Sequence, residues 1–566
     1  MIRFPAAIGG LLLWAVILYI PFWTGHVDME GDGYFHNRAV VQIAQAQTEG
    51  TVYPQWLPEQ RGGLGDPSFV YYPPLFHTAS ALIDHAVGNA WTAMKAAMLL
   101  STALAGVIAF LYLRTLFPMH LALLGALAIE ANPLPIHQMA KGGLYSANVV
   151  YPLVLLCLIM LIRIKPKSWV SPGLALSVCA LTLTHVLTCF MLCITIPAGI
   201  MVHSILRKEQ MRASVSRLVQ SCLSIGLGIC LAGFYIVPAL TTLQYISPDQ
   251  WVLSGPCSME RSFLLPFYTH KFGFCWESVQ IGFPLAATVG LVIAALYVRR
   301  IEKRHVRFGI GLLICIGAWA LFLGSDLSYP MWQVHSPLQK LQFPDRFNAV
   351  ILPAALLALT LATLYSWRQT SRARISMLLA ATLSVPVVVS GLLVADLLRL
   401  PAKATAPDKP LGSEDTARPE YLPAVAKPGY RDYLRAGSFA GECRRLGISC
   451  ETLQTSSSQY RFRIDTKKPV TVRLPLFAYP AWATFVDGRR LSTIVDANTG
   501  VIRVSLPPGA HDIRLRWTMM PQQWLGIWIS IVALIVTGLL FWSTRKRTDL
   551  EAQWAAVSAS ISPVTS

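Results

Sequence analysis

About twelve apolar runs divide this chain, and they constrain its fold more than any other feature. A bilayer is spanned by roughly 17–25 apolar residues in helical form, and most of the runs approach or reach that length. The runs cover 6–23, 91–113, 118–131, 145–162, 172–186, 188–205, 218–238, 283–298, 308–324, 346–366, 375–396 and 523–542. Because only 13% of the residues are charged, against about 25% in a soluble protein, we predict a polytopic α-helical membrane protein.

Short basic clusters predict which side of the membrane each loop faces. They lie beside the apolar runs, at Arg163–Lys167, Arg207–Arg217, Arg299–Arg307, Arg368–Arg374 and Arg545–Arg547. If Arg3 lies in the cytoplasm, every cluster falls on the cytoplasmic side, as the positive-inside rule requires. We therefore expect a multi-pass protein of the cell inner (plasma) membrane with both termini cytoplasmic and the first run retained as an anchor. The net charge of +18 belongs to these clusters rather than to a basic domain, which argues against nucleic-acid binding.

The cysteines separate into two groups that agree with this topology. Seven of the eleven lie inside the apolar runs, at Cys157, Cys179, Cys189, Cys193, Cys222, Cys230 and Cys315. The other four lie on the predicted outer side in two local pairs. An oxidising compartment would permit the disulfides Cys257–Cys275 and Cys443–Cys450, and free thiols are the alternative.

Along the chain, a helical membrane region is followed by a small outer domain, a last transmembrane helix and a tail. These parts cover 1–396, 397–520, 521–545 and 546–566. The membrane region carries two long outward loops, at 24–90 and 239–282. In the first of these loops, the pattern of apolar residues predicts short helices near 34–46 and 75–87.

The small outer domain is predicted to be a β-sandwich in the periplasm or outside the cell. Its first part, 402–430, is rich in proline, alanine and charge, which is typical of a tether. From Tyr460 onward apolar and polar residues alternate, as in strands with one buried face. The dipeptide Asp487-Gly488 predicts a hairpin turn, so we expect an antiparallel arrangement.

The first outward loop concentrates the residues that could carry chemistry. Asp28, Glu30, Asp32, His36 and Arg38 lie within eleven residues, soon after the first apolar run. A carboxylate held near the membrane surface can act as a general base toward a hydroxyl, and a guanidinium suits phosphate. We predict Asp32, His36 and Arg38 as catalytic residues; the alternative is a solvated acidic loop.

A divalent metal, Mg²⁺ or Mn²⁺, is the cofactor that this loop could hold. Carboxylate oxygens are the ligands that such hard cations prefer. Asp28, Glu30 and Asp32 are therefore the candidate metal ligands.

Other polar residues on the outer side could converge on an anionic lipid headgroup or on a sugar. The basic candidates are Lys141, His185, Lys340 and Arg346, and the aromatic candidates are Tyr71 and Tyr72. Anchoring at the membrane interface is the alternative for each of them. The sequence has no Gly-rich phosphate loop followed by Lys-Ser/Thr, so an activated group would have to reach this side on a lipid.

Several motifs, in order along the chain, resemble a known group of membrane proteins. They include Asp32-Gly-Tyr-Phe-His36-Asn-Arg38, Gly50-Thr-Val-Tyr53-Pro54-Gln-Trp56, Tyr71-Tyr72-Pro73-Pro74-Leu75, Leu183-Thr184-His185, Leu341-Gln342-Phe343-Pro344-Asp345-Arg346-Phe347 and Leu476-Phe-Ala-Tyr-Pro480-Ala-Trp482. An outward first loop with an Asp soon after the first span resembles the GT-C superfamily of membrane glycosyltransferases, which use polyprenyl-phosphate sugars. More narrowly, the chain resembles the bacterial membrane proteins labelled 6-pyruvoyl-tetrahydropterin synthase-related and their YfhO-like relatives, over about 25–520.

This resemblance implies a GT-C-like fold and a transferase in the cell envelope. The implied reaction moves a sugar from a polyprenyl-phosphate carrier to a lipid, polysaccharide or glycoprotein acceptor on the outer face. Asp32 would be its catalytic carboxylate, and His185 and Arg346 would contact the donor phosphate. The sequence departs from the pattern at Gln55, where a basic residue is expected, and at Asp345, where an aromatic one is expected.

Two other functions stay open on the sequence alone. Twelve spans also suit a transporter or flippase of a lipid-linked sugar, although few charges lie deep in the runs and no internal repeat is visible. A non-catalytic envelope assembly factor that keeps the fold is the third possibility. All three functions involve contact with membrane lipids.

Overall fold

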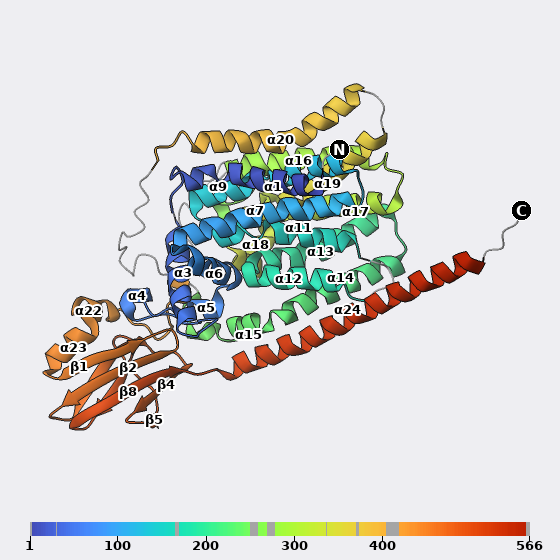
Figure 1. The fold of residues 1–566 in the computed structure, drawn as a ribbon. Helices are drawn as coiled ribbons and strands as arrows, with labels where there is room; N and C mark the ends of the chain where they lie inside the picture. Colours follow the sequence, from blue (N-terminus) through green and yellow to red (C-terminus); the bar gives the residue numbers. More distant parts are fainter. Residues whose placement is uncertain are drawn as a thin grey trace, which may run out of the picture.

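Two parts make up the fold, a bundle of long helices and a β domain at one end of it (Figure 1). The computed structural model describes residues 3–29, 31–164, 169–248, 258–268, 278–334, 337–369, 373–402 and 418–561. The last helix begins beside the β domain and runs along the bundle to its other end, where the N-terminus also lies. A bundle with a β domain at one end is the class that the sequence predicts.

Ten helices or helix pairs in the described part of the chain are long and apolar enough to cross a membrane. They are α7 (Ala90–Arg114), α8 with α9 (Met119–Glu130 and Pro133–Gly142), α10 with α11 (Tyr145–Asn148 and Tyr151–Ile162), α13 (Val186–Arg207), α14 (Met211–Leu231), η5 with α16 (Ser278–Gly282 and Phe283–Val298), α17 (Arg304–Gly324), η8 with α19 (Pro344–Phe347 and Asn348–Gln369), α20 (Ala373–Leu397) and α24 (Pro521–Ile561). Two shorter apolar helices are α1 (Phe4–Leu18) and α12 (Pro172–Thr184). Each predicted run overlaps one of these helices, so the polytopic helical class is confirmed. The predicted tail is helical as far as Ile561.

Local chemistry explains where some helices break. Asn132 accepts a hydrogen bond from the Leu134 amide at 3.2 Å and caps α9, whose first residue is Pro133. Proline lacks an amide proton and is favoured at the first position of a helix. His185 caps α13 in the same way, since its Nδ1 accepts from the Thr188 amide at 3.3 Å. The cap fixes the His185 ring at the junction between α12 and α13.

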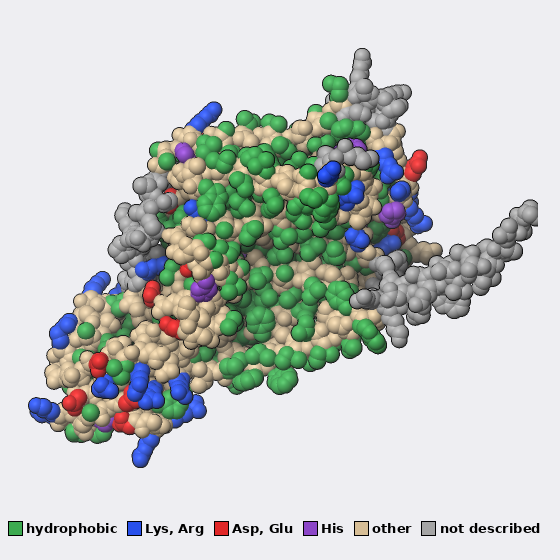
Figure 2. Space-filling model, in the orientation of Figure 1, with side chains coloured by type: hydrophobic (Ala, Val, Ile, Leu, Met, Phe, Trp, Pro, Cys, Tyr) green, Lys and Arg blue, Asp and Glu red, His purple; other side chains and the backbone are tan. Residues whose placement is uncertain are grey.

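The core of the bundle is built around α19, which packs against α16, α17, α8 and α11. Its alanine- and leucine-rich sequence buries side chains on all sides, as for Val350, Leu357 and Leu361. By contrast, α24 exposes most of its apolar residues. Figure 2 shows hydrophobic side chains over most of the visible face of the bundle, as expected of a surface in contact with lipid.

The first loop, 24–90, folds into short helices at the end of the bundle that faces the β domain (Figure 1). They are α3 (Gly33–Thr48), α4 (Gln60–Gly63), α5 (Ser68–Tyr71) and α6 (Leu75–Val87). Both helices predicted here are confirmed, and α6 has the predicted ends. Phe35, Ala39, Val40 and Ile43 form the buried face of α3, which packs against α6.

Other short helices lie between the long ones. They are α2 (Ile20–Trp23), α15 (Gly233–Thr241), α18 (Tyr329–Gln333), the 3₁₀ turns η7 (Pro337–Leu341), η8 (Pro344–Phe347) and η9 (Pro419–Tyr421), and α22 (Tyr430–Arg435) and α23 (Ser438–Leu446) ahead of the strands. Of these, η8 and η9 carry residues of the candidate site.

The β domain is an antiparallel sandwich of two sheets. One sheet has the order β1 (Ser449–Thr455), β2 (Gln459–Thr466), β8 (Gly509–Trp517), β4 (Trp482–Val486), β5 (Arg489–Leu491), and the other β3 (Val470–Phe477), β7 (Val501–Leu506), β6 (Ile494–Val495). The hairpin turn at Asp487-Gly488 is confirmed, and both residues have positive φ, as a type I′ turn requires. The segment after the turn is divided between the two sheets instead of forming one strand, because the chain crosses from one to the other between Leu491 and Ile494.

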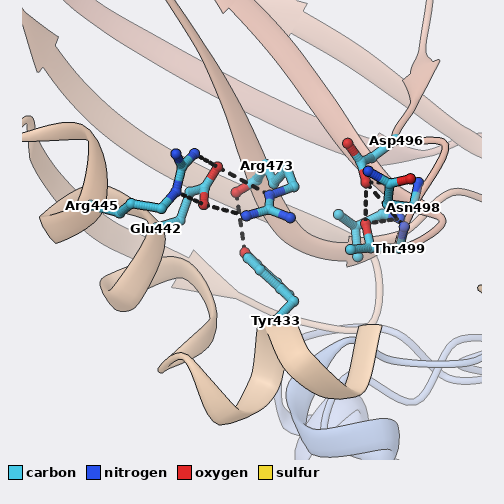
Figure 3. A network of polar contacts seen from close by, with 8 residues as sticks. Tyr433, Glu442, Arg445, Arg473, Asp496, Asn498 and Thr499 are labelled. Carbon is cyan, nitrogen blue, oxygen red and sulfur yellow. Dashed lines mark hydrogen bonds and ion pairs between the residues drawn. The ribbon is translucent and has the colours of Figure 1, made fainter. Parts of the chain in front are cut away.

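A buried network joins α23 to β3 (Figure 3). The Glu442 side chain, only 2% exposed, accepts hydrogen bonds from Arg473 at 2.6 and 3.1 Å and from Arg445 at 3.1 and 3.2 Å. Tyr433 donates its hydroxyl to the Arg473 carbonyl at 3.1 Å. A second group nearby closes a turn, where Asp496 accepts from the amide and hydroxyl of Thr499. The contacts of Glu442 and Tyr433 with Arg473 fix α23 and α22 on the sandwich.

A disulfide between Cys443 and Cys450 ties α23 to β1, with an S–S distance of 2.12 Å. This is the pairing that the sequence predicts. The other predicted pair, Cys257–Cys275, lies outside the described residues.

The β domain is docked on the first loop through aromatic contacts. Trp56 donates its indole N–H to the Tyr460 hydroxyl at 3.2 Å. Its ring lies 5.6 Å from that of Trp482 and 5.9 Å from that of Trp517. Gln55, where the resemblance predicts a basic residue, accepts a hydrogen bond from Gln523 of α24. The loop, the β domain and the last helix therefore meet at one point.

The segment that enters the β domain is packed rather than extended. The sequence predicts a tether over 402–430, but in the described part, 418–430, Tyr421 and Tyr430 are buried. Ala424 donates its amide to the Tyr245 carbonyl at 2.9 Å. The tether interpretation is therefore wrong for 418–430. Tyrosine side chains supply the apolar area that holds this proline-rich segment in place.

Candidate functional site

Two glycines place Asp32 at the junction between the first loop and the bundle. A Cβ at Gly31, where φ is +52°, would lie 2.6 Å from the Gly142 carbonyl oxygen, and a Cβ at Gly33 would lie 2.8 Å from the Tyr145 hydroxyl. Only glycine permits such close approach. The Asp32 amide donates to the Gly142 carbonyl at 3.4 Å. The start of α3 is thereby pressed against α9 and α10, and Asp32 is fixed between them.

The Asp32 carboxylate forms an ion pair with Arg418, a residue of the segment that enters the β domain. Oδ1 of Asp32 contacts Nη2 of Arg418, and the two side chains are 38% and 26% exposed. The guanidinium carbon also lies 5.6 Å from the centre of the Phe35 ring. A cation over an aromatic ring is attracted by its π face. Arg418 therefore contacts both Asp32 and the first turn of α3.

A buried ion pair in the first loop supports the backbone of Arg418. Arg61 donates to the Arg418 carbonyl oxygen and also to Asp66, at 3.3 Å. Asp66 is fully buried and accepts from the amide and hydroxyl of Ser68. Burial raises the pKa of Asp66, although the charge of Arg61 opposes this. The loop thus presents a fixed donor to the chain at Arg418.

Three further residues surround the Asp32–Arg418 pair. Tyr72 shares a hydrogen bond of 2.7 Å with Ser146, and burial raises its pKa to about 12. Burial also raises the pKa of Glu420, against the opposing charge of Arg418. Tyr421 stacks on Tyr71 with ring centres 6.2 Å apart, and its edge contacts Tyr72. We call Asp32, Tyr72, Arg418, Glu420 and Tyr421 the Asp32 cluster.

The His36 side chain is buried, whereas the Asp32 side chain is partly exposed. The ring is 1% exposed, and its Nδ1 lies 2.8 Å from Nε2 of His77. Burial, and then the charges of Arg418 and His185, lower the pKa of His36 well below its ordinary value. A neutral, buried His36 fixes α3 on α6 through its bond to His77.

Arg38 is half-buried on α3. Its Nη1 is buried and has no hydrogen-bond partner among the described residues. The structure gives it no direct contact with Asp32 in the part of the chain that it describes.

His185 and Arg346 face the Asp32 cluster from the bundle side. Arg346, in η8, donates to the Leu341 carbonyl at 2.8 Å and lies over the Phe343 ring at 4.9 Å. The charges of Asp32 and Glu420 act on Arg346, and the charge of Arg346 acts on His185. Asp345, the second departure from the family pattern, lies beside Arg346 and provides a local negative charge. Arg346 is therefore within electrostatic reach of Asp32, and His185 is within electrostatic reach of Arg346.

Lys141 and Asp28 share a cavity whose lining includes no residue of the Asp32 cluster. They line a cavity of about 200 Å³ together with His26, Val27, Ala140, Leu400 and Pro401. Lys340, on η7, is exposed.

Tyr71, in α5, joins the first loop to Thr242 after α15 and to Tyr479 of the β domain. Its hydroxyl donates to the Thr242 carbonyl at 2.8 Å and lies 3.0 Å from the Tyr479 hydroxyl. Tyr71 is buried and contacts the Asp32 cluster through Tyr421, whereas Tyr72 is within electrostatic reach of Asp32 and Arg418 themselves.

The described carboxylates do not converge as a metal site requires. Asp28 Oδ1 accepts the Met29 amide at 2.7 Å, and Asp32 Oδ1 holds the guanidinium of Arg418. No group of three or more His, Cys, Asp or Glu that could bind a metal occurs in the described ranges. Glu30, the third predicted ligand, lies outside them, and the metal stays a prediction.

The sequence reasoning missed Arg418, Glu420 and Tyr421. They lie in the segment that was interpreted as a tether because of its proline, alanine and charge content. Tyr421 and Tyr430, two aromatic residues in a stretch rich in proline, alanine and charge, were the available signal. Nothing in the local pattern indicates that Arg418 meets Asp32, because the contact joins segments far apart in the chain.

Comparisons with known proteins identify a family for most of the helical bundle. Residues 69–398 match the family described as the 6-pyruvoyl-tetrahydropterin synthase related domain, a membrane protein. Among solved structures, the chain is similar to arabinofuranosyltransferase AftD from Mycobacteria, with a TM-score of 0.42 and 14% identity over 90% of this chain and 40% of that chain. A mutant of that enzyme gives 0.40 and 14% over 67% and 27%. The chain thus spans less than half the length of these solved chains. A comparison with curated proteins found no match.

Proposed function

Given that the chain belongs to the membrane-protein family of the 6-pyruvoyl-tetrahydropterin synthase related domain, we propose that it is a glycosyltransferase. It moves a sugar from a polyprenyl-phosphate carrier to an acceptor of the cell envelope. The observation that carries this proposal is the Asp32 carboxylate, which is partly exposed, paired with Arg418 and within electrostatic reach of Arg346, while Arg346 in turn is within reach of His185. A base next to several cationic or imidazole groups suits a reaction with an anionic leaving group.

In the proposed reaction Asp32 is the general base. Its carboxylate takes the proton of an acceptor hydroxyl while the oxygen of that hydroxyl forms a bond to the anomeric carbon of the sugar. The bond between that carbon and the phosphate oxygen breaks, and the polyprenyl phosphate leaves as an anion. His36 and Arg38 support the base from α3, since His36 anchors the helix behind it.

Arg346 and His185 are the proposed contacts of the donor phosphate. A guanidinium presents a planar fork that matches phosphate oxygens. Tyr72 is within electrostatic reach of Arg346 and can pack on the sugar, whereas the exposed Lys340 and Lys141 suit lipid headgroups.

The distribution of charge supports an outward-facing site. Figure 2 shows basic side chains gathered at the end of the bundle away from the β domain, the end at which α1 begins in Figure 1. By the positive-inside rule this end faces the cytoplasm. Asp32 and the β domain then lie on the outer side, where a lipid-linked donor is available.

The test is complementation of a gene deletion by wild type and by Asp32→Asn, followed by mass spectrometry of envelope glycans and polyprenyl-phosphate sugars. We expect loss of one glycan with accumulation of one lipid-linked sugar, corrected by wild type and not by Asp32→Asn. The matched control is Asp432→Asn, an exposed carboxylate of the β domain. Full rescue by Asp32→Asn at normal abundance would remove Asp32 from catalysis and favour transport or assembly.

A further inference from the structure

We infer that the β domain completes the Asp32 site, and that Arg418 is the positioning residue through which it does so. Arg418 holds one oxygen of the Asp32 carboxylate and leaves the other for the acceptor hydroxyl. This inference rests on the proposed function, because it assigns a role in that reaction to a residue outside the bundle and the first loop.

The first step is the asymmetry of the Asp32 carboxylate. Oδ1 contacts Nη2 of Arg418, while Oδ2 accepts no hydrogen bond from the described ranges of the chain. The side chain is 38% exposed, so water or a hydroxyl can reach the free oxygen. A carboxylate with one oxygen held presents the other in a defined direction, which is what proton abstraction from a bound hydroxyl requires.

The second step is that the guanidinium is itself held in place. It lies over the ring of Phe35, which is buried and belongs to the first turn of α3. Asp32 immediately precedes that helix. Both partners of the ion pair are therefore attached to the same helix start, and a movement of α3 would carry them together.

The third step is that the backbone of Arg418 depends on the first loop. Arg61 binds the Arg418 carbonyl, and the buried Asp66 holds Arg61. Three residues later, Tyr421 stacks on Tyr71. The position of Arg418 is thus set by contacts at its own carbonyl and at Tyr421, and not only by its pair with Asp32.

The aromatic contacts of the β domain, and not the Asp32–Arg418 pair, hold the domain on the first loop. A partly exposed ion pair contributes little to stability, so the Asp32–Arg418 pair does not hold the β domain in place. Burial of aromatic rings contributes much more, and Trp56 packs among Trp482, Trp517 and Tyr479 of the β domain. The docked β domain therefore brings the segment that carries Arg418 to the first loop, where Arg61 and Phe35 hold Arg418 beside Asp32.

The experiment compares four chains in the deletion strain at equal abundance: wild type, Arg418→Gln, Arg418→Lys and Arg461→Gln. Arg461 is the matched control, since it pairs with Asp512 at 2.8 Å within the β domain. We expect Arg418→Gln to lower the product glycan roughly 10- to 100-fold, as misplacement of a reacting group does. Arg418→Lys should recover part of that loss, because it keeps a cationic donor, and Arg461→Gln should equal wild type.

A binding measurement separates positioning from donor binding. Undecaprenyl phosphate is added to the purified full-length chain, and its stabilisation against thermal unfolding is measured. If Arg418 acts through Asp32, Arg418→Gln keeps this stabilisation while the glycan is lost. Loss of the stabilisation would mean that Arg418 binds the phosphate itself, and would overturn the inference.

Two further outcomes are decisive. A product glycan within about twofold of wild type in Arg418→Gln would overturn the inference, since misplacement costs far more. If Arg418→Gln is not produced at normal abundance, Arg418→Met decides, because it keeps the apolar contact with Phe35 and lacks the charge. Rescue by Asp32→Asn would instead remove the proposed function, whereas failure of Asp32→Asn with normal activity of the Arg418 variants removes the inference alone.

Discussion

Two pairs of carboxylate and guanidinium join distant segments of this protein, and they differ in how much of the carboxylate is used. In the β domain, both oxygens of Glu442 accept from Arg473 and from Arg445, and the side chain is 2% exposed. At the end of the bundle, one oxygen of Asp32 meets Arg418 and the side chain is 38% exposed. The chemical groups are the same, but only Asp32 keeps an oxygen available.

The difference separates a structural carboxylate from a reactive one. A buried carboxylate needs every oxygen satisfied, because an unpaired buried charge is strongly destabilising. A carboxylate that must take a proton from a substrate needs one oxygen free and a support that does not cover it. Glu442 meets the first requirement and Asp32 the second. We therefore predict that a substitution at Asp32 abolishes activity and leaves the stability of the fold unchanged. A substitution at Glu442 should lower the stability and leave the activity unchanged.

The largest expected effect is on activity, from Asp32→Asn. General-base catalysis contributes about 10²- to 10⁴-fold, so the product glycan should fall by at least about 100-fold. Thermal unfolding of the purified chain should change little, since a partly exposed pair contributes less than about 1 kcal/mol. If Asp32→Asn unfolds at a much lower temperature than wild type, Asp32 is a structural carboxylate like Glu442, and the distinction between the two is wrong.

The next effect is on docking, from Trp56→Ala. Removing a buried aromatic side chain costs about 3–5 kcal/mol, so the β domain should separate more easily from the first loop. Limited proteolysis of the full chain should then cleave faster near the entry of the β domain, and the product glycan should fall with it. The Glu442 network should be unaffected, because it lies within the β domain.

The control for docking is Trp169→Ala, which alters a tryptophan that is 79% exposed. It should be cleaved at the wild-type rate. Equal cleavage of the Trp56 and Trp169 variants would show that the aromatic contact does not hold the domain.

A smaller effect on stability is expected from Glu442→Gln. Hydrogen bonds to charged groups contribute about 1.5–3 kcal/mol, and the change weakens those from Arg473, so we expect a loss of about 2 kcal/mol. Unfolding followed by tryptophan fluorescence measures it, with the exposed Asp432→Asn as control. At equal protein abundance, Glu442→Gln should give as much product glycan as wild type. A large loss of glycan would contradict the purely structural role of Glu442.

The smallest effect is on pH dependence. Burial raises the pKa of Glu442, but the hydrogen bonds from Arg473 and Arg445 outweigh it and hold this pKa below the ordinary value of 4.5. A carboxyl whose pKa is lowered by folding adds stability above its unfolded pKa and loses that contribution as the pH falls through the folded value. The unfolding temperature of wild type should therefore drop more steeply below about pH 4.5 than that of Glu442→Gln. If the unfolding temperatures of the two proteins change with pH in parallel, the Glu442 charge does not contribute to the stability of the domain.

The site could be predicted in part. Asp32, Arg346 and His185 were predicted as polar residues on the outer side, and in the structure Arg346 is within electrostatic reach of both Asp32 and His185. His36 was predicted beside Asp32 from helical spacing, but it is buried on His77, which lies on another helix. Spacing along a helix gives the face of a residue and cannot say which neighbour covers that face.

The sequence by itself determined the elements whose causes are local. Long apolar runs must become helices in lipid, because backbone groups there have no water to bond, and alternation with turn residues dictates hairpins such as the one at Asp487-Gly488. Only the tertiary structure decided which carboxylate meets which cation. That choice depends on the docking of Trp56 against the β domain and on close approaches at Gly31 and Gly33. Contacts between distant segments arise from packing in three dimensions, and no periodicity in the chain records them.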